Sequence, residues 1–308
     1  MKIIFFGTPK FAVASLLKML EAGFEVVAVV TAPDKPAGRG LKMQASDVKQ
    51  FALEKKLPVL QPEKLKNPEF ISQLKSYNAD LFVIIAFRML PEMVWNMPPL
   101  GSINLHGSLL PQYRGAAPIN RAIMNGEKET GVTTFFLKHE VDTGSIILRE
   151  KVKIDDNDTA GTLHDKLMEV GAGLVVKTLQ VIKAGNYILE EQDVSQETKH
   201  APKIFKEDCK INWNKTVEEN YNFIRGLSPY PTAWTMLDNL GLKIFFAEKK
   251  YNEPEKPGTI ATDSKTYFRI ACTEGWLSIT DLQLEGKKRM GVEDFLRGFD
   301  LLKHTEVG

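Results

Sequence analysis

Short apolar runs alternate with amphipathic segments along the first part of the chain, up to about Gly185. Continuously apolar runs at 2–6, 25–31 and 80–87 are typical of strands buried on both faces of a parallel sheet. A short strand is predicted at 101–106 and a further strand at 131–141. Helical spacing predicts helices at 11–23, 46–56, 68–77, 117–126 and 159–185. This alternation predicts a doubly wound α/β domain with a Rossmann-like, mostly parallel sheet.

After Gly185 the pattern changes. A polar stretch without periodicity predicts a linker, and Thr216 with Glu219 predicts a capping box at the start of a helix. Short strand-like runs follow at 232–237, 242–250, 258–262, 267–273 and 275–284. Their spacing predicts a small C-terminal β-barrel of OB-like type, a sandwich being the alternative. The expected division is 1–188 for the α/β domain, 189–205 for the linker and 206–308 for the barrel.

Composition adds limits to this picture. The 308 residues are 43% hydrophobic and 26% charged with a formal net charge of +1, so a nucleic-acid partner would need a local basic patch. Cys209 and Cys272 are the two cysteines and form neither a CxxC pair nor a zinc pattern. No apolar run is long enough to span a membrane, and the N-terminus does not resemble a signal peptide. We expect a cytoplasmic protein.

Candidate chemistry centres on Asn104, His106 and Asp142. Asn104 and His106 are two residues apart at the end of a predicted strand, so their side chains share a face. Asp142 follows another predicted strand, and we expect its carboxylate at the same edge of the sheet. An imidazole beside an amide and a carboxylate suits acyl transfer. The alternative is that all three are turn residues. For His139, His164, His200 and His304 we expect solvated surface.

Two basic segments can be interpreted either as binding sites or as ordinary surface. Lys35, Arg39 and Lys42 lie among prolines and glycines, and Lys287, Lys288 and Arg289 form a second cluster. The first is predicted to be a mobile loop that contacts RNA phosphates. The alternative for both is ordinary solvated surface. The segment GTPKFA has too few glycines for a dinucleotide-binding turn, and no metal-ligand spacing is present.

Several of these segments together resemble the methionyl-tRNA formyltransferases: FFGTPKFA, TAPDKPAGRG, NLHGSLLPQYRGAAPI, ETGVTTFF and VDTGSII. The resemblance covers nearly the whole chain. It implies an N-terminal catalytic domain and a C-terminal barrel that helps to bind tRNA. It also implies that Asn104, His106 and Asp142 are catalytic. The implied folate contact is the turn formed by Ser108, Leu109, Leu110 and Pro111, and the implied tRNA contact is Arg39. Phe87 and Arg88 replace a Tyr-Gly pair found in many members and are expected to line the folate site.

The activity implied by the resemblance is transfer of a formyl group from 10-formyltetrahydrofolate to methionyl initiator tRNA, with no metal. A monomer that does not bind membranes is expected. One alternative is a formyltransferase acting on the amine of a sugar nucleotide, which the basic PAGRG segment disfavours. A second is a non-catalytic RNA-binding protein, which the presence of Asn104, His106 and Asp142 disfavours.

Overall fold

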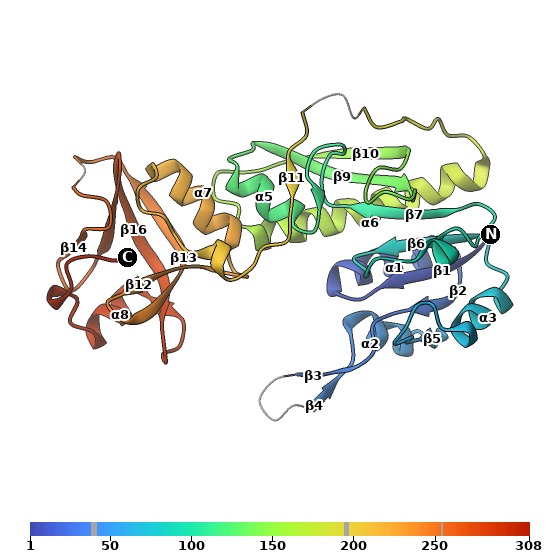
Figure 1. Ribbon diagram of the computed structural model, residues 1–308, viewed down its shortest axis with the longest axis horizontal. Helices are drawn as coiled ribbons and strands as arrows, with labels where there is room; N and C mark the ends of the chain where they lie inside the picture. The colour runs from blue at the N-terminus through green and yellow to red at the C-terminus, as the bar shows by residue number, and fades with distance from the viewer. Residues whose placement is uncertain (38–41, 194–196, 254) are drawn as a thin grey trace. The chain divides into compact units, whose positions relative to one another are not determined.

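A computed structural model describes residues 1–308 except 38–41, 194–196 and 254 (Figure 1). The contacts within the chain divide it into two compact units. Unit 1 consists of Met1–Gly115, Thr130–Val152 and His164–His200. Unit 2 consists of Ala116–Glu129, Lys153–Leu163 and Ala201–Gly308. Two segments from the middle of the sequence, 116–129 and 153–163, therefore pack with the C-terminal part of the chain.

In the described part of unit 1, seven strands form one sheet in the order β10-β9-β7-β6-β1-β2-β5 (Figure 1). Strands β5, β2, β1, β6 and β7 are parallel to their neighbours, whereas β9 is antiparallel to β7. The predicted mostly parallel sheet is confirmed. The strand bounds are β1 Lys2–Gly7, β2 Glu25–Val30, β5 Val59–Leu60, β6 Leu81–Ile85, β7 Ser102–His106, β9 Glu129–Phe136 and β10 Ile146–Lys153.

The apolar runs form this sheet because both of its faces are covered. Ile4 and Phe6 of β1 point to one face, where they pack with Phe82 and Ile84 of β6 and with Phe70 from a helix. Intervening residues such as Phe5 are equally buried. The helices of this unit are α1 Lys10–Glu21, α2 Asp47–Glu54, α3 Pro68–Ser76, α4 Glu92–Trp95 and all but the first four residues of α6 Ala160–Ala184.

Two short elements differ from the predictions. The strand predicted at 131–141 ends at Phe136, and the chain returns as β10, which was not predicted. The predicted basic loop at 32–43 contains two paired strands, the antiparallel β3 (Lys35–Ala37) and β4 (Lys42–Gln44).

Unit 2 is built on antiparallel strands in the order β12-β13-β16-β15-β14, with β17 paired to β16. Helix α7 (Val217–Leu227) covers the sheet through Ile224 and Leu227. Helix α5 (Pro118–Met124) packs on α7, where the Asn120 amide donates to the Gly226 carbonyl at 2.8 Å. The remaining bounds are β8 Arg114–Gly115, β11 His200–Ala201, β12 Ala233–Leu237, β13 Leu240–Lys250, β14 Ile260–Thr262, β15 Phe268–Cys272, β16 Gly275–Leu284, β17 Met290–Gly291, α8 Val292–Gly298, and the 3-10 turns Glu207–Cys209 and Leu301–Lys303.

The last residues of the chain bond to both outer strands of this sheet. The Gly308 N–H donates to Met236 of β12, and the Ile260 N–H of β14 donates to Thr305. Just before them, His304 stacks on Phe299 with ring centroids 5.0 Å apart, and its Nδ1 lies 2.5 Å from Asp238 Oδ2. With its side chain only 18% exposed, His304 is not the solvated residue that we expected.

The cysteines Cys209 and Cys272 are both buried and unpaired. Burial raises the pKa of the Cys272 thiol to about 11. None of the helices formed by described residues is long and apolar enough to cross a lipid bilayer.

The predicted capping box is confirmed at the start of α7. Thr216 Oγ1 accepts from the Glu219 N–H at 3.1 Å, and the Glu219 carboxylate accepts from the Thr216 N–H at 3.0 Å. We expect Thr216→Ala to lower the free energy of unfolding by about 1 kcal/mol, because the Glu219 N–H loses its side-chain acceptor. Urea unfolding measures this loss. Thr216→Ser keeps the hydroxyl and is expected to retain wild-type stability, so equal losses in both variants would contradict the explanation.

Candidate active site

Strand β7 carries two of the candidate catalytic residues. It lies between β6, where Ile84 pairs with Asn104, and β9, where Phe135 pairs with Asn104. His106 is the last residue of β7 and is only 7% exposed, whereas Asn104 is half-buried. Both side chains belong to unit 1 and extend from the same face at the carboxyl end of the strand. Ligands of open α/β sheets bind at this end.

Backbone contacts determine which nitrogen of His106 carries a proton. Nε2 lies 2.8 Å from the carbonyl oxygen of Tyr113, and a carbonyl oxygen only accepts hydrogen bonds. Nε2 therefore carries the proton in this arrangement. Nδ1 faces Asp142, with 3.8 Å between Nδ1 and Oδ2. That distance is too long for a hydrogen bond, so Nδ1 remains available to a further group beside the carboxylate.

Asp142 reaches His106 by a different route from the one expected. Because β9 is antiparallel to β7, its end lies beside the start of β7, where the Leu137 N–H donates to Ser102. The sequence argument that Asp142 follows a strand ending at the same edge as His106 is therefore wrong. The loop 137–145 instead brings Asp142 back to His106.

The conformation of this loop is unusual at two residues. Asp142 has a φ of 56°, in the left-handed region that non-glycine residues seldom adopt. A Cβ on Gly144 would overlap the carbonyl oxygen of Phe136, so only glycine fits there. The Asp142 carboxylate accepts a hydrogen bond from the Gly115 N–H at 3.1 Å. Backbone conformation and contacts together direct this carboxylate toward the imidazole.

The turn predicted to contact folate follows His106 directly. The fully buried Ser108 hydroxyl donates to the Gln112 carbonyl at 2.6 Å. Thr133 Oγ1 donates to the Ser108 carbonyl at 2.7 Å and accepts from the Leu110 N–H at 3.1 Å. Leu110 is buried, while Leu109 and Pro111 are half-buried. The serine thus shapes the turn, and Leu109 and Pro111 offer its partly accessible surface.

Phe87 and Arg88 lie after β6, next to Ala86, whose φ is 48°. Phe87 packs edge-on against Phe6 with ring centroids 5.6 Å apart. The exposed Arg88 guanidinium donates to the backbone carbonyls of Pro62 and Glu63. It therefore anchors a neighbouring backbone segment.

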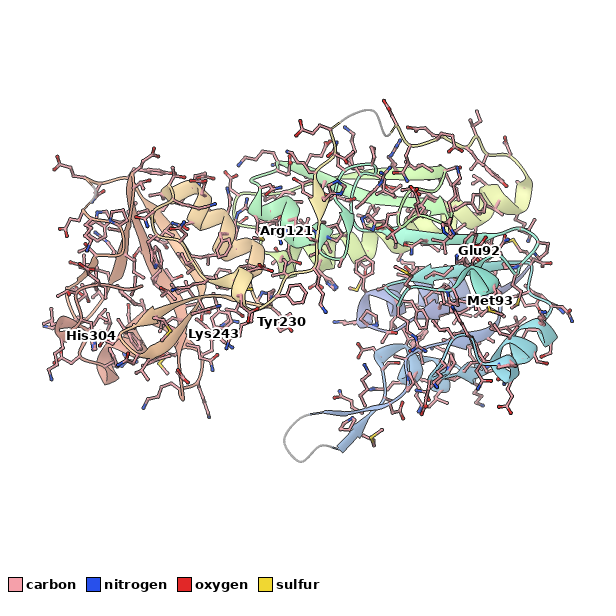
Figure 2. All side chains as sticks on the ribbon, in the orientation of Figure 1. Glu92, Met93, Arg121, Tyr230, Lys243 and His304 are labelled. Carbon is pink, nitrogen blue, oxygen red and sulfur yellow. The ribbon has the colours of Figure 1, made fainter. Side chains whose placement is uncertain are left out.

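Helix α4 follows this segment. Its exposed Glu92, labelled in Figure 2, lies 3.4 Å from Nδ1 of the exposed His139 in the Asp142 loop. This contact joins helix α4 to that loop at the surface of unit 1. Exposed pairs of this kind contribute little to stability.

The predicted RNA-binding cations have different surroundings. Lys35 is exposed on β3, Arg39 lies outside the described residues, and Lys42 belongs to β4. Lys287 and Lys288 in unit 2 are exposed and form no ion pair with described residues.

Arg289, the third cation of the second cluster, has two partners within unit 2. It pairs with Asp281 at 2.6 Å, which raises the pKa of the guanidinium. It also lies 4.0 Å from the centre of the Phe245 ring. Arg289 is thus held by the fold, unlike Lys243, which is exposed on β13 and labelled in Figure 2.

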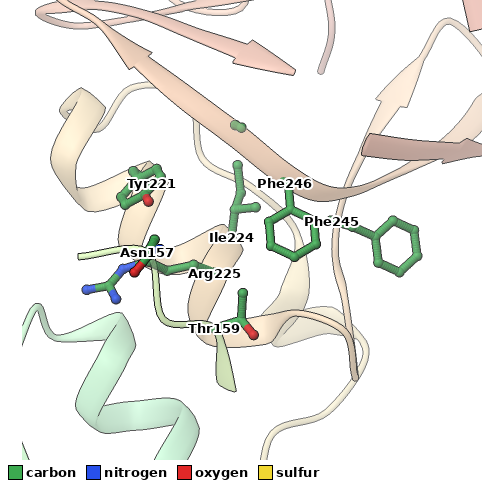
Figure 3. Close-up of a pocket in the computed structure, with 8 residues that line it drawn as sticks. Asn157, Thr159, Tyr221, Ile224, Arg225, Phe245 and Phe246 are labelled. Carbon is green, nitrogen blue, oxygen red and sulfur yellow. The ribbon is translucent and has the colours of Figure 1, made fainter. Parts of the chain in front are cut away.

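Unit 2 contains a small pocket between α7 and β13, lined by Tyr221, Arg225 and Phe246 among others (Figure 3). Arg225 is buried and donates to the Asn222 side chain and to the carbonyls of Asp155 and Asp158. Its charge is therefore used to hold the segment before α6 against α7. None of the sequence-predicted site residues lines this pocket. Among described residues, no group of three or more His, Cys, Asp and Glu side chains could hold a metal ion.

Comparison with known proteins gives matches over both parts of the chain. A family model described as "Formyl transferase" matches residues 1–179, and "Formyl transferase, C-terminal domain" matches residues 203–300. A methionyl-tRNA formyltransferase of Bacteroides fragilis is 53% identical, covering 98% of this chain and 96% of the relative. That of Flavobacterium johnsoniae is 47% identical, covering 100% and 99%. The chain belongs to the methionyl-tRNA formyltransferase family. The resemblance seen in the sequence is confirmed.

Solved structures share the fold of this methionyl-tRNA formyltransferase family member. WlaRD, a sugar 3N-formyl transferase solved in the presence of dTDP and 5-N-formyl-THF, superimposes with a TM-score of 0.68 at 25% identity and covers 94% of this chain and 99% of its own. HypX from Aquifex aeolicus, in complex with tetrahydrofolic acid, has a TM-score of 0.67 at 17% identity and covers 99% and 50%. The second likeness shows the fold alone.

Sequence reasoning missed three groups that touch the candidate site. They are Thr133, which holds the turn after His106, the Gly115 N–H, which binds Asp142, and Gln192, whose amide donates to the Asp142 carbonyl at 2.8 Å. Thr133 lies on a predicted strand, where a polar residue facing inward was the available signal. Gln192 lies in the aperiodic stretch after α6, where no pattern distinguishes it.

The overlap at Gly144 leads to a stability prediction. We expect Gly144→Ala to lower the free energy of unfolding by about 3 kcal/mol, since the added methyl meets backbone that cannot move aside easily. Gly173→Ala is the matched control, because a Cβ there meets nothing within 4 Å in the middle of α6. That control should be neutral or raise stability by up to about 1 kcal/mol. Urea unfolding compares the two, and a tolerated Gly144→Ala would show that the loop is less constrained than the contacts indicate.

Proposed function

We propose that this chain transfers the formyl group of 10-formyltetrahydrofolate to the α-amino group of methionyl initiator tRNA, at the start of translation. Its relatives at 46–54% identity are methionyl-tRNA formyltransferases. The observation that supports the chemistry is the position of Asp142 beside His106, the last residue of β7. The distance between His106 Nδ1 and Asp142 Oδ2 is 3.8 Å, and Asn104 lies on the same face of the strand as His106. The donor is a folate-derived substrate, and no metal takes part.

In the proposed reaction, the Asn104 amide donates to the formyl oxygen, and so does Nδ1 of His106 when that nitrogen also carries a proton. The two groups thereby stabilise the negative charge that develops on this oxygen. The bond that forms joins the substrate's amino nitrogen to the formyl carbon. The bond that breaks joins that carbon to N10 of tetrahydrofolate. Asp142 takes the proton that the amino group loses and returns it to the leaving nitrogen. Asp142 also keeps His106 oriented.

The remaining assignments of the proposal concern the other parts of the chain. Residues 1–188 carry the reaction and residues 206–308 help to bind tRNA, with 189–205 between them. The hydrogen bonds that Gly308 and Thr305 form with the two outer strands of unit 2 support closure into an OB-like barrel. The residues proposed to contact the folate donor are Ser108–Pro111, Phe87 and Arg88. Those proposed to contact the RNA are Lys35, Arg39 and Lys42 in unit 1 and Lys287, Lys288 and Arg289 in unit 2. The enzyme acts in the cytoplasm as a monomer.

The amine of a sugar nucleotide is the alternative acceptor. Because the fold is similar to that of WlaRD, a sugar 3N-formyl transferase, this acceptor should be tested beside the tRNA. Incubation with 10-formyltetrahydrofolate and either charged initiator tRNA or an amino-sugar nucleotide tests the choice. Formylmethionine formed only with the tRNA supports the proposal. Formylation of the sugar alone would overturn it.

The role of Asp142 can be tested by removing its charge. We expect Asp142→Asn to lower kcat at least about 100-fold, because the variant keeps its size but loses the group that accepts a proton. Affinity for tRNA should change little. The matched control is Asp165→Asn, at the exposed His164–Asp165 pair, where Nδ1 lies 3.0 Å from Oδ1. Near-normal turnover in Asp142→Asn would remove this carboxylate from the mechanism.

The basic segment at residues 35–42 leads to a salt-dependence prediction. If Arg39 contacts a phosphate, Arg39→Ala should make the log–log dependence of tRNA binding on salt shallower by about one unit. If it contacts a base edge, binding should weaken by about 1–3 kcal/mol. Folate affinity should be unchanged in both cases. Formylation measured as a function of salt concentration distinguishes the two kinds of contact. Lys75→Ala, which removes one positive charge at another exposed position, is the control. Curves identical to wild type would show that the segment is ordinary surface.

A further inference from the structure

Gln192 is a buried amide whose hydrogen-bonding capacity is fully used. It is 8% exposed, and its Nε2 donates to the carbonyl oxygens of Asp142 and Gly144, each at 2.8 Å. Its Oε1 accepts from Nε and Nη2 of Arg114, at 3.1 and 2.6 Å. Since a guanidinium only donates and carbonyls only accept, these four contacts fix the orientation of the amide.

These bonds join the two segments that hold the catalytic pair. Tyr113, Arg114 and Gly115 are consecutive residues, and each binds a different member of the site. The Tyr113 carbonyl accepts from His106, Arg114 binds Gln192, and the Gly115 N–H donates to the Asp142 carboxylate. Gln192 completes a closed set of hydrogen bonds by donating to the backbone carbonyl of Asp142. The relative position of imidazole and carboxylate is therefore held from both sides.

This closed set of hydrogen bonds matters because the backbone of Asp142 has a φ angle that non-glycine residues seldom adopt. A non-glycine residue with φ near 56° persists only where its surroundings hold it. The Gly115 bond holds the end of the side chain, whereas Gln192 holds the backbone on both sides of Thr143. Without Gln192, two carbonyls of the loop and the Arg114 guanidinium would lose a partner.

We propose that Gln192 is a positioning residue for the formyl transfer: its amide holds the Asp142 loop so that the carboxylate faces Nδ1 of His106. This inference rests on the proposed function, in which Asp142 is catalytic. The adjacent Glu191 binds the same loop differently, through the side chains of Lys138 and Ser145 at 2.6 and 2.5 Å. Lys138 lowers the pKa of Glu191, but that pair is exposed. Glu191 therefore serves as a matched control from the same segment.

The test compares Gln192→Ala, Gln192→Glu and Glu191→Ala in the full-length protein. We expect both Gln192 variants to lower kcat about 100-fold, the cost of a catalytic group displaced by about 1 Å. The KM values for the folate donor and the charged tRNA should stay within about 3-fold. Gln192→Glu places a carboxylate opposite two carbonyls, and its pH–rate profile should move to higher pH because added negative charge favours protonated forms. Glu191→Ala should keep wild-type kcat and profile.

A double variant and a spectroscopic measurement complete the test. If Gln192 acts through Asp142, the double variant Gln192→Ala, Asp142→Asn should be no slower than Asp142→Asn alone. The nitrogen signals of the His106 imidazole, measured by NMR without any substrate, should shift in Gln192→Ala and stay unchanged in Glu191→Ala. Thermal unfolding confirms that each variant is folded.

The outcomes separate the inference from the proposed function. Wild-type kcat in Gln192→Ala, equal losses in Glu191→Ala, or additive losses in the double variant would each overturn the positioning role. If the wild-type chain formylates no tRNA, the proposed function fails. The NMR signals alone then decide on Gln192, and His106 signals that Gln192→Ala leaves unchanged would overturn the inference.

Discussion

The antiparallel pairing of β9 with β7 is the constraint on which the candidate site depends. It places the end of β9 beside Ser102, at the wrong end of β7 for chemistry at His106. The chain must therefore return along the sheet in the loop 137–145 before Asp142 can face the imidazole. A short return needs glycine where the loop crosses the end of β9, at Gly144, and a left-handed turn at Asp142. The Gln192 and Gly115 contacts compensate for that conformation, so topology explains why so many polar contacts gather around one carboxylate.

Much of the fold could be predicted from local pattern. Continuously apolar strands such as β1 and β6 have no other stable place than the middle of a covered sheet, and the Thr216–Glu219 pair marks a helix start without any tertiary information. Strand direction could not be predicted in this way. The residues of β9 look the same whether the strand runs parallel or antiparallel to β7, because alternation reports which face is buried and not which neighbour is paired. β10 was missed for a related reason: beyond Ile147 its residues are partly or fully exposed and mostly charged, so its strand conformation depends on pairing with β9.

The charged residues show a different limit of sequence reasoning. Arg88, Arg225 and Arg289 are all held within the fold, by backbone carbonyls, a buried polar network and an aspartate beside an aromatic ring respectively. Lys287 and Lys288, next to Arg289 in the same basic run, form no ion pair with described residues. A run of like charges therefore mixes cations that a ligand could recruit with cations already used for stability. The same holds for histidine: His106 and His304 both face an aspartate, yet only His106 lies on a strand end where substrate sites form.

The proton on Nε2 of His106 links these constraints to the proposed chemistry. Because the Tyr113 carbonyl occupies Nε2, only Nδ1 is left to meet a reacting group, and Nδ1 faces Asp142. An acceptor amine and a formyl oxygen must therefore approach on the side of the ring that Asp142 borders, with Asn104 on the same strand face to share the developing charge. The 3.8 Å separation between Nδ1 and Oδ2 suits this arrangement, since a direct hydrogen bond between them would compete with the substrate. The loop contacts therefore have two opposing tasks: they bring Asp142 close enough to orient His106, and they keep it far enough away to leave room for the reaction.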